Sequence, residues 1–287
     1  MPERKTLSEE DIRKILPERK RDTHKGENGY AVLFAGCEHY TGAALMSAAA
    51  ALRAGCGVLT VAVPGFVKPF FSILPEACCF SVSSGKEWNR TAQKKACSLI
   101  AGKRAAGMGC GMGEMEETIL LETLLRYRIP TVLDADGLNL LSKHPELMNL
   151  LHSNLILTPH PGEMARLTGK AVSELIQDPE RSAREYAEKW NCTVLLKGYE
   201  SCISNGSSTV WNCTGNAGLA KGGSGDVLTG LILGLLAQGV RTFDAACAGA
   251  YLLGISADRA YSLLGLRMLM ASDVIDVVEQ TLNTLER

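Results

Sequence analysis

Short apolar runs alternate with helical segments along most of this chain, and this alternation restricts the fold more than any other feature. The runs that we predict to be strands are residues 30–36, 57–64, 76–82, 103–109, 130–136, 154–160 and 192–198. The helices predicted between them are residues 42–55, 91–101, 118–128 and 181–190. Near-continuous apolar strands separated by helices are typical of a mostly parallel sheet that is buried on both faces. We therefore predict an α/β fold with three layers, in which helices cover both faces of a central sheet.

The ends of the chain follow other patterns. Residues 201–213, "SCISNGSSTVWNC", predict a hairpin that turns at Asn205–Gly206. From residue 225 onward the chain is predicted to be almost wholly helical, and residues 1–20 are predicted to form an N-terminal helical segment. The small-residue and apolar helices at 42–55 and 244–257 suit either a core or an interface, and we favour the core. No repeat or linker divides the sequence, so we predict one domain over residues 1–287.

Charge and composition argue against several classes of protein. The net charge of -1 does not provide the basic surface that nucleic-acid binding requires. The sequence contains no stretch of 18 apolar residues without charge, so no membrane helix is predicted. The charged first twenty residues lack the apolar core of a signal peptide. We expect a cytoplasmic protein with no membrane partner. The ten cysteines are scattered without a CxxC pair, which favours reduced, buried thiols over zinc ligands, and we assign no metal-binding residues.

A glycine-rich turn, "AKGGSGDVLTG" at 220–230, is the most informative segment for chemistry. Three glycines within four residues, Gly222, Gly223 and Gly225, permit positive φ and a close approach of the backbone to a ligand. The helix predicted from Val227 onward would direct unpaired N–H groups at an anion. Asp226 would then accept a proton from a substrate hydroxyl beside a transferring phosphoryl group. The alternative is that Asp226 or Ser224 only caps the helix.

Polar residues also follow two of the predicted strands. Lys197 ends the strand at 192–198, where an ammonium group can meet a phosphate, or where it is simply solvated at a strand end. His160 lies between Pro159 and Pro161 in a stiff loop, which suits either a substrate contact or a structural histidine. Ligands of parallel sheets bind beyond the carboxyl ends of the strands, where both residues would lie.

Two further segments have the same placement. Asp134, Asp136 and Asn139 follow the strand at 130–136, where carboxylates can orient hydroxyls or hold Mg²⁺ through water. Asp and Asn are also common in turns and caps, so turn chemistry explains them equally well. The segment 40–43, "YTGA", begins a helix with small residues that would admit a flat ligand, although close packing on the sheet is the alternative. Neither a GxGxxG motif nor a P-loop is present, so nucleotide binding would need another geometry.

These motifs together resemble a known family. "YTGAALMSAAAALRAGCG", the "GCGMG" loop, "LDADGLNLL", "LTPHPGEM", "LLKG" and "GGSGDVLTG" occur in the order seen in ADP- or ATP-dependent NAD(P)H-hydrate dehydratases. These enzymes belong to the ribokinase-like superfamily. The resemblance covers roughly residues 10 to 280 and implies a ribokinase-like fold.

The resemblance also implies an activity. Hydrated NADH or NADPH, the S epimer, is phosphorylated on its ring hydroxyl by ADP or ATP with Mg²⁺, and loss of phosphate restores the reduced cofactor. ADP is the expected nucleotide, as in bacterial members. A homo-oligomer, a tetramer in this family, is implied as well. Many members carry an epimerase domain before the dehydratase domain, and the length of this chain leads us to expect dehydration without epimerisation.

The resemblance assigns roles to individual residues. Asp226 resembles the family's catalytic base. The family's anion hole is resembled by the run Gly222, Gly223, Ser224 and Gly225, and Gly225 also resembles a nucleotide contact. The implied nucleotide loop is Lys197, Gly198, Tyr199, Glu200 and Ser201, and the implied substrate contacts are Ala43, Gly111, His160, Asp226 and Asn139.

The sequence departs from the family pattern at two positions. Lys221 stands where many members have a small or hydroxyl residue, which would alter contacts to the nucleotide phosphates. Cys110 stands where "GPGLG" is usual, which would make that loop less rigid. Two other functions share the glycine-rich turn: a ribokinase-like kinase of a small alcohol, such as a hydroxymethylpyrimidine or hydroxyethylthiazole, and a catalytically silent nucleotide sensor.

Overall fold

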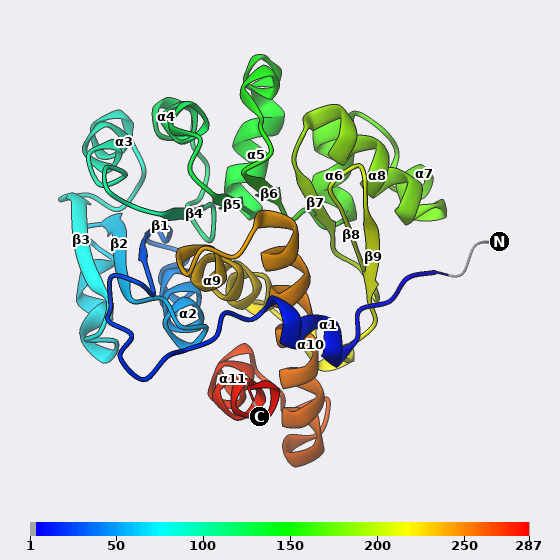
Figure 1. Ribbon diagram of the computed structural model, residues 1–287. Helices are drawn as coiled ribbons and strands as arrows, with labels where there is room; N and C mark the ends of the chain where they lie inside the picture. Colours follow the sequence, from blue (N-terminus) through cyan, green and yellow to red (C-terminus); the bar gives the residue numbers. More distant parts are fainter. Residues whose placement is uncertain (1–3, 287) are drawn as a thin grey trace.

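The computed structural model describes residues 4–286, and its central element is a nine-stranded sheet with the order β3-β2-β1-β4-β5-β6-β7-β8-β9 (Figure 1). Residues 1–3 and 287, at the ends of the predicted domain and of its N-terminal segment, lie outside the described part. The strands are β1 (Tyr30–Phe34), β2 (Val58–Pro64), β3 (Cys78–Ser83), β4 (Ala105–Met108), β5 (Thr131–Leu133), β6 (Leu155–Leu157), β7 (Thr193–Leu196), β8 (Ser201–Ser204) and β9 (Thr209–Asn212). Strands β1 to β7 pair in parallel, and β8 and β9 are antiparallel.

Helices cover both faces of this sheet. They are α1 (Glu9–Ile15), α2 (Thr41–Arg53), α3 (Arg90–Cys97), α4 (Ile119–Tyr127), α5 (Ala135–Lys143), α6 (Pro161–Thr168), α7 (Val172–Gln177), α8 (Pro179–Trp190), α9 (Ser224–Ala237), α10 (Thr242–Leu264) and α11 (Ala271–Leu285). Short 3-10 turns occur at Lys68–Ile73, Pro145–Leu150 and Ala217–Leu219. Helices α3 to α8 lie on one face, and α1, α2, α9, α10 and α11 lie on the other (Figure 1).

Each face of the sheet has its own apolar core. In β1, Leu33 packs into the core under α2 and α9, whereas its neighbour Phe34 packs into the core under α3 and α4. Successive side chains of a strand point to opposite faces, so a strand covered on both sides must be apolar throughout. This explains why the strands appear in the sequence as continuous apolar runs.

Close packing of small residues places the start of α9 at the edge of the sheet. Along α9, Gly230 and Gly234 lie against α2 so closely that a Cβ on them would be 2.2 Å from Ser47 O and 2.5 Å from Ala51 O. These glycines and the alanines of α2 therefore allow the two helix backbones to touch. Helix α9 is buried along its length from Val227, and its N-terminus lies at the carboxyl ends of the strands.

The predicted architecture is confirmed, with small shifts in boundaries. The predicted parallel strands and the hairpin at Asn205–Gly206 are present, and the helices at 42–55 and 244–257 contribute to the core of this chain. The predicted helix start at Val227 was wrong, because α9 begins three residues earlier, at Ser224. The ten cysteines are free; most are buried, although Cys78 and Cys213 are exposed. None of the helices within residues 4–286 is long and apolar enough to cross a membrane.

Candidate active site

The order of the strands along the sheet reverses between β1 and β4, and the loops after these two strands meet at its carboxyl edge. A hydrogen bond from Gly36 N to Cys110 O, 2.9 Å long, joins the two loops. Gly111 has a φ of 59°, and a Cβ on it would lie 2.6 Å from Tyr40 Cβ and 2.7 Å from Ala43 Cβ. Only glycine fits this contact. Ala43 and Gly111, both predicted to contact substrate, are thus brought together at the point where ligands bind in open α/β sheets.

The glycine-rich turn delivers the first turn of α9 to the same edge. Its N-cap is Gly223, which has a left-handed φ of 99°, and no side chain makes a capping hydrogen bond there. The interpretation of Ser224 or Asp226 as a simple N-cap is therefore wrong, because both residues lie inside the first turn. The first backbone N–H groups of a helix have no partner within it, so this turn offers donors to an anion.

Asp226 is a partly buried carboxylate with a perturbed acidity. Burial is the main cause that raises its pKa to about 6, and the neighbouring Asp134 adds to the rise. A hydrogen bond from the Cys110 thiol and the charge of Lys197 act in the opposite direction. Burial thus opposes the positive end of the α9 dipole, which by itself favours the ionised carboxylate. A carboxylate with a pKa close to neutrality is suited to general base catalysis.

Lys197 is the centre of a buried charge network at the end of β7. Its Nζ lies 2.7 Å from Asp134 Oδ1 and 3.7 Å from Glu163 Oε2, while Thr229 Oγ1 donates to Asp134 Oδ2 at 3.0 Å. Burial by itself would lower the pKa of Lys197, but Asp134 and Glu163 raise it. The solvated strand end that we considered for Lys197 is wrong. A Cβ on Gly225 would lie 3.8 Å from Nζ, so the ammonium is also next to the glycine-rich turn.

His160 begins α6 and has an oriented ring. The ring Nδ1 accepts hydrogen bonds from Gly162 N at 3.0 Å and Glu163 N at 3.4 Å, and the backbone N–H of His160 donates to Glu163 Oε2 at 2.8 Å. Since Nδ1 is the acceptor, the neutral ring has its proton on Nε2. The side chain is 51% exposed. His160 can therefore donate a hydrogen bond to a ligand from Nε2.

Asp136 and Asn139 lie in the first turns of α5 and contact each other. Gly113 N donates to Asp136 Oδ2 at 2.8 Å, Asn139 Nδ2 donates to Asp136 Oδ1 at 3.3 Å, and Arg166 donates to Asn139 Oδ1 at 3.0 Å. Burial raises the pKa of Asp136. These residues line a cavity of about 320 Å³ together with Tyr40. The Asp136 carboxylate thus ties the loop after β4 to α5, and Asn139 faces a cavity at the same edge.

A second cavity, of about 450 Å³, opens beside the start of α9. The predicted nucleotide residues that line it are Lys197, Gly198, Tyr199, Ser201 and Gly225, and Ser224 joins them. Tyr199 is 96% exposed and forms part of the rim. Glu200 does not line this cavity, because its carboxylate pairs with Arg4 at 2.6 Å. Its predicted place at the nucleotide is therefore not supported by the geometry.

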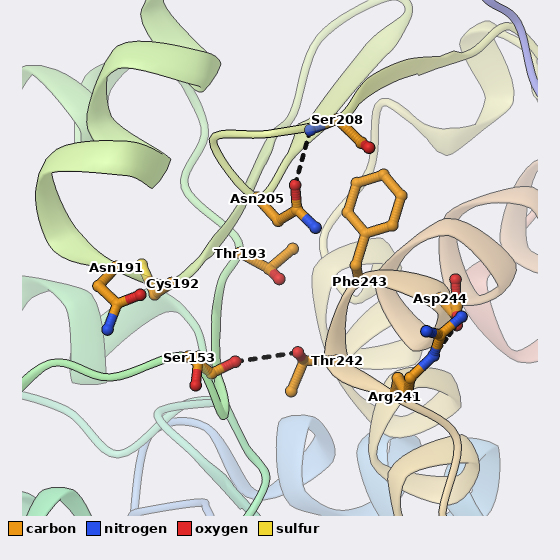
Figure 2. Close-up of a pocket in the computed structure, with 10 residues that line it drawn as sticks. All are labelled: Ser153, Asn191, Cys192, Thr193, Asn205, Ser208, Arg241, Thr242, Phe243 and Asp244. Carbon is orange, nitrogen blue, oxygen red and sulfur yellow. Dashed lines mark hydrogen bonds and ion pairs between the residues drawn. The ribbon is translucent and has the colours of Figure 1, made fainter.

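A cavity of similar size lies at the opposite edge of the sheet (Figure 2). It measures about 460 Å³ and is formed by residues before β6 and β7, by the hairpin turn and by the start of α10. None of the predicted site residues lines it. Because α/β sheets bind ligands at the carboxyl ends of their strands, we place the candidate site at the other edge. Among residues 4–286 no group of three His, Cys, Asp or Glu side chains could hold a metal ion.

Several residues of this site were not predicted from the sequence. Glu163, Thr229 and Arg166 enter it as partners of Lys197, Asp134 and Asn139. In the sequence, a carboxylate in the first turn of a helix indicates a helix cap. Glu163 therefore gave no sign of its role, because only the strand order brings it next to Lys197.

Lys221 and Cys110, the two residues that depart from the family pattern, both contact named groups near the site. The Lys221 ammonium donates to Arg267 O at 2.7 Å and to Leu269 O at 2.6 Å, in the loop between α10 and α11. Cys110 is fully buried beside Asp226, and desolvation raises the pKa of its thiol. Burial makes this thiol a poor nucleophile, so its effect on the site is through its contact with Asp226.

Comparison with known proteins agrees with the motif resemblance. The profile of the NAD(P)H-hydrate dehydratase family matches residues 31–279. An ADP-dependent (S)-NAD(P)H-hydrate dehydratase from Neisseria meningitidis is 39% identical over 250 residues, which cover 85% of this chain and 81% of that protein. The bifunctional NAD(P)H-hydrate repair enzyme Nnr from Moorella thermoacetica is 37% identical over 295 residues, covering 99% of this chain and 54% of that protein. The chain thus spans about half the length of such bifunctional relatives.

Solved structures give the same result. An ADP/ATP-dependent NAD(P)H-hydrate dehydratase from Bacillus subtilis, co-crystallised with ATP/Mg²⁺, has a TM-score of 0.88 at 32% identity, with both chains covered in full. A hydroxyethylthiazole kinase from Pyrococcus horikoshii has a TM-score of 0.62 at 15% identity, covering 94% of this chain and 92% of that chain. The latter similarity shows the fold alone. A ribokinase-like superfamily protein from Enterococcus faecalis, with a TM-score of 0.83 at 22% identity and coverage of 99% of this chain and 97% of that chain, shares this fold as predicted.

Proposed function

The chain belongs to the NAD(P)H-hydrate dehydratase family, and we propose that it uses a nucleotide to dehydrate the S epimer of hydrated NADH or NADPH. The observation that supports this most directly is the position of Asp226. Its carboxylate lies in the first turn of α9, beside the left-handed Gly223. One cavity at this point is lined by the predicted nucleotide residues, and the predicted substrate contacts Ala43 and Gly111 lie at the same edge of the sheet.

In the proposed reaction Asp226 accepts the proton of the ring hydroxyl as the hydroxyl oxygen attacks the terminal phosphorus of the nucleotide. The bond from that phosphorus to the leaving nucleotide breaks, which releases AMP from ADP or ADP from ATP. The ring C–O bond then breaks, phosphate leaves, and loss of a ring proton restores the reduced nicotinamide. The N–H groups of Ser224 and Gly225, with the dipole of α9, stabilise the negative charge of the transferring group.

The nucleotide is proposed to occupy the cavity of about 450 Å³. Gly225 and Ser224 would face its phosphates, and Gly198, Tyr199 and Ser201 would line its other side. Lys197 retains donors beyond its bond to Asp134, so it can meet a phosphate without leaving its buried position. We propose ADP rather than ATP, as the name of the Neisseria relative indicates.

Magnesium is proposed to enter with the nucleotide. The described residues supply no cage of ligands, but Mg²⁺ keeps water and phosphate oxygens as ligands and needs few side chains. When bound, the ion would neutralise charge on the phosphates.

The hydrated cofactor is proposed to lie against Ala43 and Gly111, which pack closely together at the carboxyl edge of the sheet. His160 would donate a hydrogen bond from Nε2, and Asn139 would contact the ligand from α5. A small-alcohol kinase is the alternative, but the similarity to the hydroxyethylthiazole kinase supports a shared fold without supporting a shared substrate.

The test is to incubate the protein with hydrated NADH and either ADP or ATP, and to follow recovery of the reduced-nicotinamide absorbance. Recovery is expected with ADP. No recovery with either nucleotide would contradict the dehydratase function, and phosphorylation of a hydroxymethylpyrimidine or hydroxyethylthiazole instead would support the kinase. Recovery that survives Asp226→Asn would contradict the proposed role of Asp226 as the base, because a residue that can be replaced without loss of function is not needed for the reaction.

We also propose that residues 1–287 act as one domain, as a homo-oligomer, with a tetramer as the expected state, in the cytoplasm. The proposal rests on the family resemblance and on the composition of the chain. Light scattering after size-exclusion chromatography would measure the oligomer, and a monomer at micromolar concentration would contradict it.

A further inference from the structure

The ammonium of Lys221 is bound to backbone carbonyls instead of pointing freely into solvent. It donates to Arg267 O at 2.7 Å and to Leu269 O at 2.6 Å, both in the loop that joins α10 to α11. Lys221 directly precedes the first glycine of the glycine-rich turn, Gly222. One side chain therefore links the start of the anion-binding turn to a loop 46 and 48 residues further along the chain.

A second contact joins the same loop to the wall of the nucleotide cavity. Leu269 is fully buried, and a Cβ on Gly218 would lie 2.5 Å from Leu269 Cδ2. The neighbours of Gly218, namely Ala217, Leu219 and Ala220, line the cavity of about 450 Å³. The backbone of this wall thus rests directly on Leu269.

The loop meets the glycine-rich turn again at its far end. Helix α11 begins at Ala271, and a Cβ on Gly223 would lie 3.0 Å from Ala271 Cβ. Between these contacts Leu266, Met268 and Met270 are largely exposed, at 42%, 69% and 56%. Because exposed side chains contribute little to holding a loop in place, its conformation depends strongly on Lys221 and Leu269.

We propose that Lys221 is a positioning residue that fastens the α10–α11 loop to the glycine-rich turn and thereby holds the nucleotide cavity in its binding shape. This inference deepens the proposed function, since it takes the occupant of that cavity to be an adenine nucleotide. The competing role for Lys221 is a direct contact with the nucleotide phosphates. The two roles make different predictions for the protein without nucleotide and for nucleotides with different numbers of phosphates.

The test compares Lys221→Met, which keeps the length of the side chain and removes its charge, with Lys221→Arg. Lys14→Met serves as the matched control, because Lys14 pairs with Glu10 on the surface of α1. Hydrogen exchange of residues 266–270 is measured without nucleotide, and the dissociation constants of AMP and ADP are measured by calorimetry. Circular dichroism and Tm establish that each variant is folded.

For Lys221→Met we expect faster exchange in the loop and dissociation constants for AMP and ADP that both rise by about tenfold, the value of one charge-assisted hydrogen bond. Lys221→Arg, which keeps a cation able to bind carbonyls, should restore most of both effects. Unchanged loop exchange with a loss confined to ADP would overturn the proposal in favour of direct phosphate contact, and unchanged exchange with unchanged binding would overturn it as well. If Lys221→Met does not fold, Lys221→Gln, which removes the charge and keeps a donor for one carbonyl, is measured in its place, with the same expected and contradicting results. Hydrogen exchange of the loop is measured without nucleotide or hydrated cofactor. Failure of the proposed function would therefore be seen separately, as a wild-type protein whose loop is protected from exchange but which shows no turnover.

Discussion

The ammonium of Lys197 lies 2.7 Å from the carboxylate of Asp134, although the two residues are 63 positions apart in the chain. The pair joins the ends of β5 and β7 across β6, and Asp134 is only 2% exposed. The candidate site therefore has an internal ion pair beside the glycine-rich turn. Removing either partner would leave the other charge buried and unpaired, at a cost in free energy of folding.

We expect Lys197→Met to destabilise the protein by about 3 kcal/mol, because it leaves the buried Asp134 carboxylate without its counter-ion. The free energy of unfolding from urea titration measures this loss. The double variant Lys197→Met with Asp134→Asn should recover part of the stability without recovering turnover. Equal stability of the single and double variants would show that the pair contributes little.

Asp226→Asn should abolish most activity and raise stability. Loss of a general base lowers kcat by about 10²–10⁴-fold. Since the folded pKa of Asp226, about 6, exceeds the ordinary aspartate value of 3.8, the folded state binds this proton more tightly than the unfolded state. The contribution of Asp226 to the stability of the wild type therefore falls as pH rises from about 4 to about 6 and is level above that. At pH 7 the variant should gain on the order of 1–3 kcal/mol, seen as a higher urea midpoint, whereas a gain of the same size at pH 3 would contradict this origin.

The pH profile of turnover should show the ionisation of Asp226 directly. Protonated Asp226 cannot accept the hydroxyl proton, so kcat/KM is expected to fall below a pKa of about 6. The Cys110 thiol donates a hydrogen bond that lowers this pKa, so Cys110→Ala should move the acid limb of the profile to higher pH. Cys192→Ala, a change at a buried thiol next to the opposite cavity, is the control and should leave the limb in place.

Gly223→Ala and Gly222→Ala should differ sharply despite being neighbours. Gly223 has a φ of 99°, and a Cβ on it would lie 2.7 Å from Met46 Sδ, whereas a Cβ on Gly222 would meet nothing within 4 Å. Backbone strain and this contact should cost Gly223→Ala about 1–3 kcal/mol and most of its nucleotide affinity. Thermal unfolding and calorimetry measure the two effects. A similar loss for Gly222→Ala would mean that flexibility of the turn, and not the close contact, is what matters.

Much of the fold follows from local patterns. Continuous apolar strands, with helices between them, predicted a parallel sheet covered on both faces, and the motif order predicted the family. The predicted helix boundary was wrong at the glycine-rich turn. The left-handed Gly223 lets α9 begin before Val227, because glycine can cap a helix without a side-chain hydrogen bond.

The sequence by itself determined which residues stand at the ends of strands and at the start of α9, since strand and helix periodicity are properties of neighbouring residues. It therefore placed Asp226, Lys197, His160 and Gly111 in one region. Only the tertiary structure decided their partners: Lys197 with Asp134, Lys221 with the carbonyls of 267 and 269, and Glu200 with Arg4 instead of the cavity. These pairings depend on the strand order and on how closely glycines let backbones approach. The burial that raises the pKa of Asp226 arises in the same way, because desolvation is set by the surrounding packing and not by the adjacent residues.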